Sequence, residues 1–393
     1  MYKDLNNNVY YIGTDDMKSE LFESQYIIPE GIAYNSYLIR DEKVAILDTA
    51  DAVMGEEWKA NLMESLDGRT PDYLVIHHME PDHSALAAWV LEEWKDVTLV
   101  ASQKAIQMMP LFFEGIKLEG RTLAVKDGDT LDLGRQRLRF IAAPMIHWPE
   151  VMMSYEETEG TLYSADAFGK FGALAKCGFR GCDDDDWTCE GRRYYFNIVG
   201  KYGAQVKNLL AKVSQLDVRS IRPLHGPILE DELDKYISLY TTWSNYEAET
   251  EGVFIAVASI HGNTLHAAER LRDMLQEKGV KVAFSDLCRS DFAENVEDAF
   301  RYPRLVLAAS SYDGGLFTPM YNFLHLLKSK GYSNRKVALM ENGSWAPCAA
   351  RVMRAELEGM KNVEVVENTL TLRGCLKQSD MPAMQALADA IKE

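Results

Sequence analysis

The sequence has no long hydrophobic run and few cysteines. No stretch approaches the roughly 18 consecutive apolar residues of a membrane-spanning helix, and the opening stretch MYKDLNNNVYYIGTDD lacks the apolar region of a secretion signal. Six cysteines in 393 residues exclude the dense disulfide framework of small secreted domains. These absences predict a soluble, cytoplasmic protein with no membrane partner.

The sequence also has fewer basic than acidic residues. The chain carries 42 Lys and Arg against 60 Asp and Glu, a formal net charge of −18. A surface of this sign repels phosphate, which argues against nucleic acid as a partner. The length of 393 residues and the hydrophobic content of 47% are enough for two domains with separate cores.

The hydrophobic pattern changes near residue 250. Before it, short apolar runs separated by turn residues predict hairpins over 33–50 and 122–144, with helical stretches such as 85–94 between them. After it, five strand-like runs alternate with amphipathic stretches, which predicts a doubly wound parallel sheet. We therefore expect an α/β chain of two domains, 1–250 and 253–393, joined by the polar stretch 241–252.

Two helices of the second domain can be outlined from the sequence. Apolar residues at i, i+3, i+4 and i+7 predict a helix that packs on the sheet through Met320, Phe323, Leu324 and Leu327. Another helix is expected to begin at Thr264, as its N-cap, and to end before Gly279.

A dense cluster of metal-ligand residues follows the apolar run DYLVI. Within HHMEPDH, His78, Glu80 and Asp82 alternate, so on an extended segment they would point to one side, and His83 would come from the next turn. Such density makes a metal site the better interpretation than a solvated surface. The neighbouring His77 is better explained as a packed or solvated histidine that only shapes the pocket.

Three more ligand-type residues, His147, Asp166 and His225, each follow a short apolar run. Taken singly, each is better explained as a surface polar group. Together with the cluster they give seven imidazoles and carboxylates without a thiolate, which suits iron, manganese or zinc. Seven ligands are too many for one tetrahedral ion and fit two metal ions ~3.5–4 Å apart that share a carboxylate.

A second signal lies in ASIHGNTLHAAERL, where a polar loop joins a strand to a helix. Amide groups at a helix start, with Ser and Thr hydroxyls, form a cradle for phosphate. The loop has neither GxGxxG nor a Walker lysine, which argues against a dinucleotide or a nucleoside triphosphate. Two later loops, in SSYDGGLF and ENGSWAP, also follow strands, at the sheet edge where ligands bind in such folds. The candidate cofactor-binding residues of the three loops are Ser259, Ile260, His261, Gly262, Asn263, Thr264, Ser311, Tyr312, Asp313, Gly314, Gly315, Asn342, Gly343, Ser344 and Trp345.

Some residues of these loops suit a flat ring. Gly314 and Gly315 would let the backbone approach closely, and Tyr312 and Trp345 are candidates to pack on the ring, although a place in a core or an interface explains them equally well. His266 is better explained as a residue of the helix surface.

These motifs together resemble a known family. HxExDH followed by His, Asp and His resembles the metallo-β-lactamase-like proteins, whose hydrolases usually carry HxHxDH. With Glu80 in place of the second histidine, with YNSYLI, EPDHS, YYFNIVGKYG and PLHGPI, and with 18 residues between His147 and Asp166, the chain resembles the flavodiiron proteins (A-type flavoproteins). SxxGNT is similar to the FMN phosphate loop of flavodoxins. The resemblance implies a metallo-β-lactamase-like αββα sandwich that holds a diiron centre in residues 1–250 and a flavodoxin-like FMN domain in 253–393.

The resemblance implies an oxidoreductase that reduces O2 to water, NO to N2O, or both. One iron would be held by His78, Glu80 and His147, the other by Asp82, His83 and His225, with Asp166 as the bridge. Family members differ on whether the histidine at the position of His83 coordinates. The resemblance also implies a head-to-tail homodimer or dimer of dimers. Electrons would come from rubredoxin, another small carrier or a reduced deazaflavin, because the sequence contains neither rubredoxin-type CxxC pairs nor an NAD(P)H-oxidoreductase module.

Two other functions remain open at this point. The first is a dinuclear metallohydrolase, for example of thioesters, with an accessory flavodoxin-like domain; Glu80 and the SxxGNT loop argue against it. The second is a non-enzymatic electron carrier with a vestigial metal site, although all seven ligand positions are filled.

One segment departs from the family pattern. Cys177, Cys182 and Cys189 lie in KCGFRGCDDDDWTC, and the C-x4-C-x6-C spacing is not a usual zinc spacing. We interpret them as thiols of an acidic surface loop, with a redox or metal role as a minor alternative.

Overall fold

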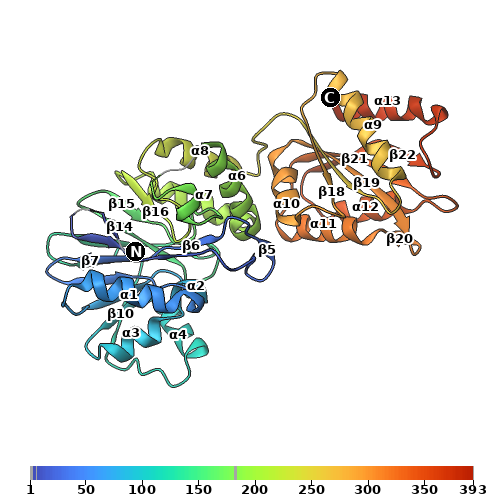
Figure 1. Ribbon diagram of the computed structural model, residues 1–393. Helices are drawn as coiled ribbons and strands as arrows, with labels where there is room; N and C mark the ends of the chain where they lie inside the picture. Colours follow the sequence, from blue (N-terminus) through green and yellow to red (C-terminus); the bar gives the residue numbers. More distant parts are fainter. Residues whose placement is uncertain (1–2, 6, 181–183, 393) are drawn as a thin grey trace. The chain divides into compact units, whose positions relative to one another are not determined.

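The computed structural model describes residues 3–5, 7–180 and 184–392 (Figure 1). The chain forms two compact units. The first contains Met1–Tyr195 and Ala204–Tyr240, and the second contains Phe196–Gly203 and Thr241–Glu393. The stretch 241–252, in which we expected the domain boundary, belongs to the second unit.

Two mixed sheets form the centre of the first unit. The strand order is β1-β2-β7-β8-β9-β10-β11 in the first sheet and β12-β13-β14-β15-β16 in the second. The first sheet consists of β1 (Lys3–Asp4), β2 (Val9–Tyr11), β7 (Tyr37–Arg40), β8 (Val44–Leu47), β9 (Tyr73–Ile76), β10 (Thr98–Ser102) and β11 (Thr122–Val125). The second consists of β12 (Thr130–Asp132), β13 (Arg137–Ala142), β14 (Met152–Glu156), β15 (Thr161–Tyr163) and β16 (Ser220–Arg222). Two small pairs join β3 (Thr14–Asp16) to β6 (Ile32–Tyr34) and β4 (Leu21–Phe22) to β5 (Tyr26–Ile27).

Helices cover the outer faces of both sheets. On the side of the first sheet lie α1 (Gly55–Leu66), α2 (Pro81–Ser84), α3 (Ala87–Glu93) and α4 (Gln103–Phe112), and on the side of the second lie α6 (Asp184–Tyr194), α7 (Gly203–Val213) and α8 (Leu233–Ser244) (Figure 1). The shorter elements of this unit are η1 (Ala52–Met54) and α5 (Leu174–Cys177). The π-helical η2 (Tyr195–Val199) and η3 (Gly200–Tyr202) lie, except for Tyr195, in the stretch Phe196–Gly203 of the second unit. The first unit is therefore an αββα sandwich, as the sequence predicted.

The core of the sandwich lies between the sheets. Alternate residues of each strand point inward, as the period of two requires, and Val75 and Val100 of the first sheet share one buried cluster with Leu138, Phe140 and Met152 of the second. Burial on this scale stabilises the unit by ~25 cal/mol for each Å² of apolar surface removed from water.

The structure confirms one of the two predicted hairpins and only part of the other. Strands β7 and β8 pair antiparallel, which confirms the hairpin over 33–50. The second prediction is right only for β12 and β13, which pair antiparallel. Strand β11 instead pairs parallel with β10 in the other sheet. Alternation of polar and apolar residues identifies a strand but not its sheet, because both sheets bury one face in the same core.

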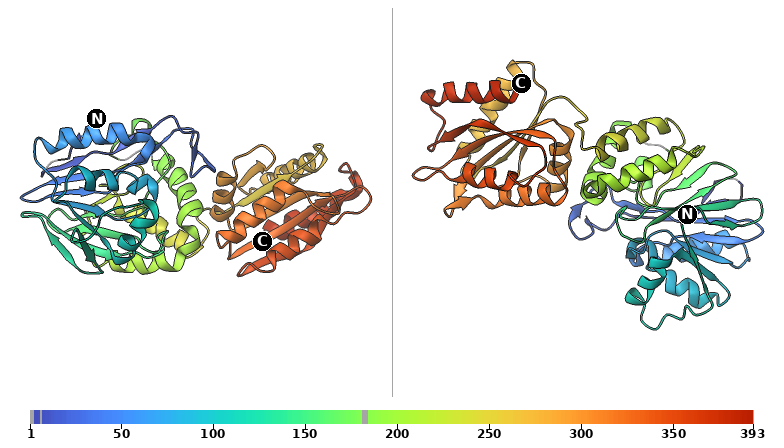
Figure 2. Two further views of the ribbon diagram at one scale, coloured as in Figure 1. Left: turned by 90° about the horizontal axis from the view of Figure 1, so that it is seen from below. Right: turned by 180° about the vertical axis from the view of Figure 1, so that it is seen from behind.

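The second unit is a parallel sheet with the order β18-β17-β19-β21-β22. Its strands are β17 (Val253–Ala258), β18 (Val282–Asp286), β19 (Arg304–Tyr312), β21 (Arg335–Asn342) and β22 (Val363–Leu372), and β20 (Gly315–Leu316) pairs antiparallel with β19. Its helices are α9 (Asn263–Glu277), α10 (Phe292–Arg301), α11 (Thr318–Ser329), α12 (Ala349–Leu357), η4 (Gln378–Asp380) and α13 (Met381–Lys392). Helices α9 and α13 contact each other on one face, and α10, α11 and α12 pack in a row on the other (Figure 2). This confirms the doubly wound sheet.

The details of two helices test the sequence patterns. The predicted apolar face of α11 is confirmed, because Met320, Phe323, Leu324 and Leu327 are all fully buried. The N-cap prediction is wrong: α9 begins at Asn263 with Gly262 as its N-cap, and Thr264 lies inside the first turn. Among the described residues, every helix falls short of the length and apolarity that crossing a lipid bilayer requires.

Candidate metal centre and flavin pocket

The structure brings the seven predicted metal ligands together at the ends of four strands. Strands β9, β13, β15 and β16 each lead into a loop that carries one or more of them. They form two groups, His78, Glu80, His147 and Asp166 in one and Asp82, His83 and His225 in the other. Within each group the ligand atoms lie within 4.8 Å of one another. The roles of these residues as metal ligands remain a prediction.

Glu80 connects the histidines of the first group. Its Oε2 lies 3.1 Å from Nε2 of His78 and 3.0 Å from Nε2 of His147. In the second group Asp82 connects the two histidines in the same way. Its Oδ2 lies 3.2 Å from Nε2 of His83 and 3.3 Å from Nε2 of His225. Each group therefore contains two imidazoles whose Nε2 atoms point toward the same carboxylate.

Asp166 lies between the two groups. Its Oδ2 is 3.3 Å from Nε2 of His78 and 3.6 Å from Nε2 of His147. Its Oδ1 is 3.3 Å from Nε2 of His83 and 3.6 Å from Nε2 of His225. A carboxylate that offers one oxygen to each group has the geometry of a bridge between two metal ions.

The local backbone differs from the expected extended segment. Strand β9 ends at Ile76, Glu80 is the N-cap of α2, and Asp82 and His83 lie on that helical turn. The turn explains why Glu80 and Asp82 serve different groups although they are two residues apart. Behind the other ligands, Gly226 follows His225 at φ +82, where a Cβ would approach Cγ of Lys170 to 2.6 Å, so this turn requires glycine.

Hydrogen bonds at the outer ring nitrogens fix two of the histidines. Nδ1 of His78 lies 2.8 Å from Oε1 of the buried Glu150, which also accepts the amide of Met79 at 2.9 Å. Nδ1 of His225 lies 2.7 Å from the carbonyl oxygen of Ala33. A histidine that donates through Nδ1 presents the lone pair of Nε2 to a metal. Sequence patterns did not indicate Glu150 or Ala33, because neither stands in a motif.

The electrostatics of the centre suit cations. Burial alone would raise the pKa of the Asp166 carboxyl, but His78 and His83 hold it well below its usual range. Burial alone would likewise lower the pKa of the His83 imidazole, but Asp82 and Asp166 raise it to about 9. Oxygens and nitrogens of this kind, buried and close together, are stable when a shared cation or proton lies between them.

Unpartnered atoms at the centre also fit metal ions. Both oxygens of Asp82, Oδ2 of Asp166, Nε2 of His225 and both ring nitrogens of His83 are buried and have no hydrogen-bond partner among the described residues. Buried polar atoms are normally satisfied. The set contains imidazoles and carboxylates only, the donors that iron and manganese accept. The residues present therefore fit a pair of such ions.

The neighbouring His77 is packed, as expected. Its Nδ1 lies 2.5 Å from Oδ2 of Asp48 and its Nε2 lies 2.8 Å from the Ser154 hydroxyl. This order resembles a hydrolytic triad, but Ser154 is fully buried. A substrate carbonyl cannot reach that hydroxyl, so the three residues connect the two sheets rather than form a catalytic site.

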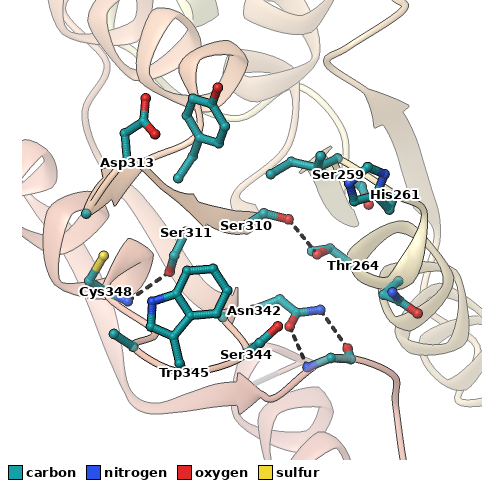
Figure 3. A pocket seen from close by; sticks show the side chains of 17 residues that line it. Ser259, His261, Thr264, Ser310, Ser311, Asp313, Asn342, Ser344, Trp345 and Cys348 are labelled. Atoms are coloured by element: carbon teal, nitrogen blue, oxygen red, sulfur yellow. Dashed lines mark hydrogen bonds between the residues drawn. The ribbon is translucent and has the colours of Figure 1, made fainter.

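A pocket of about 510 Å³ lies at the carboxyl edge of the sheet in the second unit (Figure 3). It is bordered by the loop between β17 and α9, the turn between β19 and β20, and the loop after β21. Thirteen of the predicted cofactor-binding residues line it; Gly262 and Gly315 do not. The lining residues are Ser259, Ile260, His261, Asn263, Thr264, Ser310, Ser311, Tyr312, Asp313, Gly314, Asn342, Gly343, Ser344, Trp345, Ala346, Cys348 and Gly374.

The end of this pocket at the start of α9 has the chemistry that we predicted for a phosphate site. Helix α9 has no side-chain cap, so its first amides are available to an anion. The buried Thr264 points its Oγ1 toward the Ser310 hydroxyl, 2.9 Å away (Figure 3). The Ser259 hydroxyl accepts the amide of Gly262 at 3.1 Å. Ser310 is the first residue of SSYDGGLF but was not among the predicted cofactor-binding residues; it lies on β19, before the turn.

The opposite end of the pocket has exposed aromatic rings. Trp345 is 88% exposed and Tyr312 is 46% exposed, and large apolar surfaces of this kind mark binding sites. The Ser311 hydroxyl accepts the amide of Cys348 at 2.8 Å (Figure 3) and the amide of Ala349 at 3.1 Å. Ser311 therefore also organises the start of α12.

Several of the remaining residues lie near the surface. His266 is exposed on α9, with Nδ1 at 3.9 Å from Oε2 of Glu269. Cys177 ends α5 and is half-buried, and Cys189 is exposed on α6. Cys182 lies outside the described residues, and the interpretation of the three cysteines remains a prediction.

Comparison with known proteins shows which proteins the chain is similar to. The family model described as "ODP family beta lactamase" matches residues 32–226. An anaerobic nitric oxide reductase flavorubredoxin of Vibrio vulnificus is 27% identical, over 89% of this chain and 72% of its own length. A protein of Nostoc sp. named as a diflavin flavoprotein is 30% identical over 75% of this chain and 51% of its own, so the chain spans about half the length of that relative.

Solved structures agree in fold. The rubredoxin oxygen:oxidoreductase of Desulfovibrio gigas has a TM-score of 0.93 at 22% identity and covers 100% of this chain and 98% of its own. The chain is similar to the flavodiiron proteins in sequence and in fold. The flavodiiron protein of Giardia intestinalis has a TM-score of 0.92 at 22% identity, and the match covers 100% of this chain and 96% of that protein. Flavodiiron proteins are oxidoreductases that use FMN and a diiron site. The predicted fold of both parts of the chain is confirmed.

Proposed function

We propose that the chain is a flavodiiron protein that reduces O2 to water, NO to N2O, or both at a pair of irons, with electrons that pass through FMN. The position of Asp166 supports this most directly, because each of its oxygens lies within 3.6 Å of two Nε2 atoms of one ligand group. Such symmetry provides for two metal ions that act on one small substrate. Relatives named for nitric oxide reduction and for oxygen reduction support both substrates.

The ligand assignment follows the two groups. We assign His78, Glu80 and His147 to one iron and Asp82, His83 and His225 to the other, with Asp166 shared. Four imidazoles and three carboxylates leave a net charge of about +1 with two ferrous ions, so the buried centre is nearly neutral when loaded. Tyr194 donates its hydroxyl to Oδ1 of Asp166 at 3.1 Å, which holds a proton beside the bridge.

The flavin pocket supplies the second cofactor site. We assign the FMN phosphate to the start of α9 with Ser259 and Thr264, and the ring to the side of Tyr312 and Trp345. FMN exchanges electrons singly or in pairs, and each ferrous ion gives one, so the two cofactors can supply the several electrons that O2 or NO requires. This capacity, together with Glu80 where a hydrolase usually has histidine, favours reduction over hydrolysis.

We also propose that the enzyme is cytoplasmic, receives electrons from an external donor such as rubredoxin, and acts as a head-to-tail homodimer or dimer of dimers. In that arrangement the FMN of one subunit would serve the irons of the next. Sedimentation during turnover tests this assembly. Full activity in a species that sediments as a monomer would contradict it.

Stopped-flow kinetics test the reaction itself. Protein loaded with iron and FMN under anaerobic conditions is fully reduced and mixed with O2, while flavin reoxidation is followed and peroxide is assayed. Rapid reoxidation without peroxide is expected for four-electron reduction at the metal centre. Slow reoxidation that releases peroxide would mean autoxidation of the flavin, and NO would then be the substrate to test under the same conditions.

A further inference from the structure

One tryptophan lies directly against the metal centre and is not used by the proposed reaction. Trp148 follows the predicted ligand His147 in the sequence, and the centre of its ring lies 6.3 Å from that of His147 and 5.2 Å from that of His78. Both contacts are edge-to-face, at interplanar angles of 74° and 86°, within the distances at which aromatic rings attract each other. The indole therefore packs on two imidazoles that we assign to the same iron.

Trp148 also reaches the protein surface. Its side chain is half-buried, and its ring stacks on Phe112 with the two ring centres 6.2 Å apart. Phe112 is itself 41% exposed. The carbonyl oxygen of Trp148 accepts the amide of Met145 at 2.7 Å, which fixes the backbone at this position. The indole is thus held between the predicted metal ligands and the solvent.

The chemistry of an indole distinguishes Trp148 from another oxidisable ring at the centre, that of Tyr194. Indole is among the most easily oxidised groups in proteins, and it can lose an electron before its proton. A tyrosine must release its hydroxyl proton when it is oxidised. Tyr194 is fully buried, and its hydroxyl donates to Oδ1 of Asp166 at 3.1 Å. Since we assign Asp166 to both metals, it is a poor acceptor for that proton, and Trp148 is the easier ring to oxidise.

The proposed reaction makes such a ring useful. Reduction of O2 to water takes four electrons, and two ferrous ions with FMN supply them only when the flavin is fully reduced. When fewer electrons are present, a nearby side chain is oxidised instead. Oxidation of His78 or His147 would destroy a metal ligand, whereas oxidation of Trp148 would leave the ligand set intact.

We propose that Trp148 is the sacrificial electron donor of the metal centre and its site of oxidative modification. When O2, or hydrogen peroxide formed from it, is reduced at a centre with too few electrons, the Trp148 indole would give up the missing electron and release its Nε1 proton to water. The end product would be a hydroxylated indole. In that net step one C–H bond of the ring becomes C–OH and one H2O2 becomes one H2O, so the indole loses two electrons and the peroxide gains two. The inference rests on the proposed redox function and adds a residue that spares His78 and His147.

Peptide mapping by mass spectrometry after treatment with hydrogen peroxide tests this proposal. The holoprotein with ferrous iron and FMN is treated under anaerobic conditions, and the same protein with zinc in place of iron is treated identically, because zinc has no redox chemistry. Trp94 is the internal control, since it is also half-buried but packs on Trp89, with ring centres 5.6 Å apart. We expect Trp148 to gain oxygen several-fold more often than Trp94 in the iron protein, and no such preference in the zinc protein.

Two results would overturn the proposal. One is equal oxidation of Trp148 and Trp94 in the iron protein, and the other is the same preference for Trp148 in the zinc protein. Because peroxide is added directly, neither result depends on whether the protein reduces O2 or NO. Failure of the proposed reduction would appear separately, in the stopped-flow kinetics.

A variant tests whether Trp148 protects the ligands. Trp148→Phe keeps an aromatic ring beside His78 but removes the indole, so peroxide should oxidise His78 and His147 several-fold more often and release iron faster. Trp148→Tyr restores an oxidisable ring and should reverse part of this effect, whereas Trp94→Phe should behave like the unchanged protein. Iron content before the treatment shows that each variant still forms the centre. Unchanged oxidation of both histidines in Trp148→Phe would contradict the protective role.

Discussion

The metal centre and the flavin pocket consist of different kinds of chemical groups. The centre consists of ionisable side chains that are almost all buried, and Glu150 and the backbone carbonyl of Ala33 fix the orientation of two of them. The flavin pocket consists of hydroxyls, helix amides and exposed aromatic rings. A metal ion requires a few charged atoms at fixed positions, whereas a large flat cofactor is held by many weak contacts. Substitutions should therefore have large effects in the first and graded effects in the second.

The strongest test of this difference is removal of the bridging carboxylate. Asp166→Ala should lose or scramble both irons, because both ligand groups depend on it, while FMN remains bound in the other unit. Metal analysis and flavin absorbance of the same sample measure both effects. Asp166→Asn keeps the size of the side chain and should show the same loss, whereas Asp132→Ala, at an exposed position of β12, should retain the metal. Two irons per chain in Asp166→Ala would rule out the bridge.

A smaller effect on metal binding is expected for a residue that contacts a predicted ligand but is not itself a ligand. Glu150→Gln replaces the acceptor at Nδ1 of His78 with a neutral amide of the same shape. Loss of such an outer hydrogen bond typically weakens metal binding by about 10–100-fold. Competition with a chelator measures this change, with Glu157→Gln as control, because the half-buried Glu157 pairs with Arg137 and not with a metal ligand. Unchanged affinity would mean that the orientation of His78 is set by other contacts, and the centre would then be less rigid than we infer.

The charges of the metal centre should also make iron binding depend on pH. In metal-free protein the neighbouring carboxylates raise the pKa of the His83 imidazole from 6.5 to about 9, so at pH 7 this ring carries a proton that a metal must displace. Iron affinity should rise with pH, by up to about tenfold per unit for one proton, and level off above pH 9. Titration in buffers of different protonation enthalpy counts the released protons. Binding without proton release would exclude His83 as a ligand that starts protonated.

The sequence predicted the metal centre more completely than its surroundings. His78, Glu80, Asp82 and His83 stand in one motif, so their proximity was evident without a structure. Glu150 lies 72 residues from His78, and a single carboxylate at that distance carries no local signal. Asp48 and Ser154, which hold His77, lie 29 and 77 residues from it in the sequence.

The prediction of the fold was limited in the same way, because sequence patterns report only on nearby residues. Local periodicity predicted the strands of the parallel sheet and the buried face of α11, because those patterns depend on neighbours within a few residues. It did not predict that β11 and β12, which are joined by a short turn, belong to different sheets. Thr264 was mistaken for an N-cap because Gly262, which has no side chain to form a cap, fills that position at φ +87. Tertiary partners, and not local preference, decide such cases.

The graded behaviour expected of the flavin pocket can be tested at Thr264. Its hydroxyl is buried beside Ser310 at the start of α9, where we place the FMN phosphate. Thr264→Val removes the hydroxyl and keeps the shape of the side chain, so FMN affinity should fall by roughly tenfold, the effect of one hydrogen bond to a charged group. Thr264→Ser keeps the hydroxyl and should bind FMN nearly as well. Flavin retention on dialysis and fluorescence titration of the apoprotein measure both variants, and iron content should not change in either. Equal FMN affinity in the valine and serine variants would move the phosphate away from Thr264, whereas complete loss of FMN in the valine variant would mean that this pocket, like the metal centre, depends on single side chains.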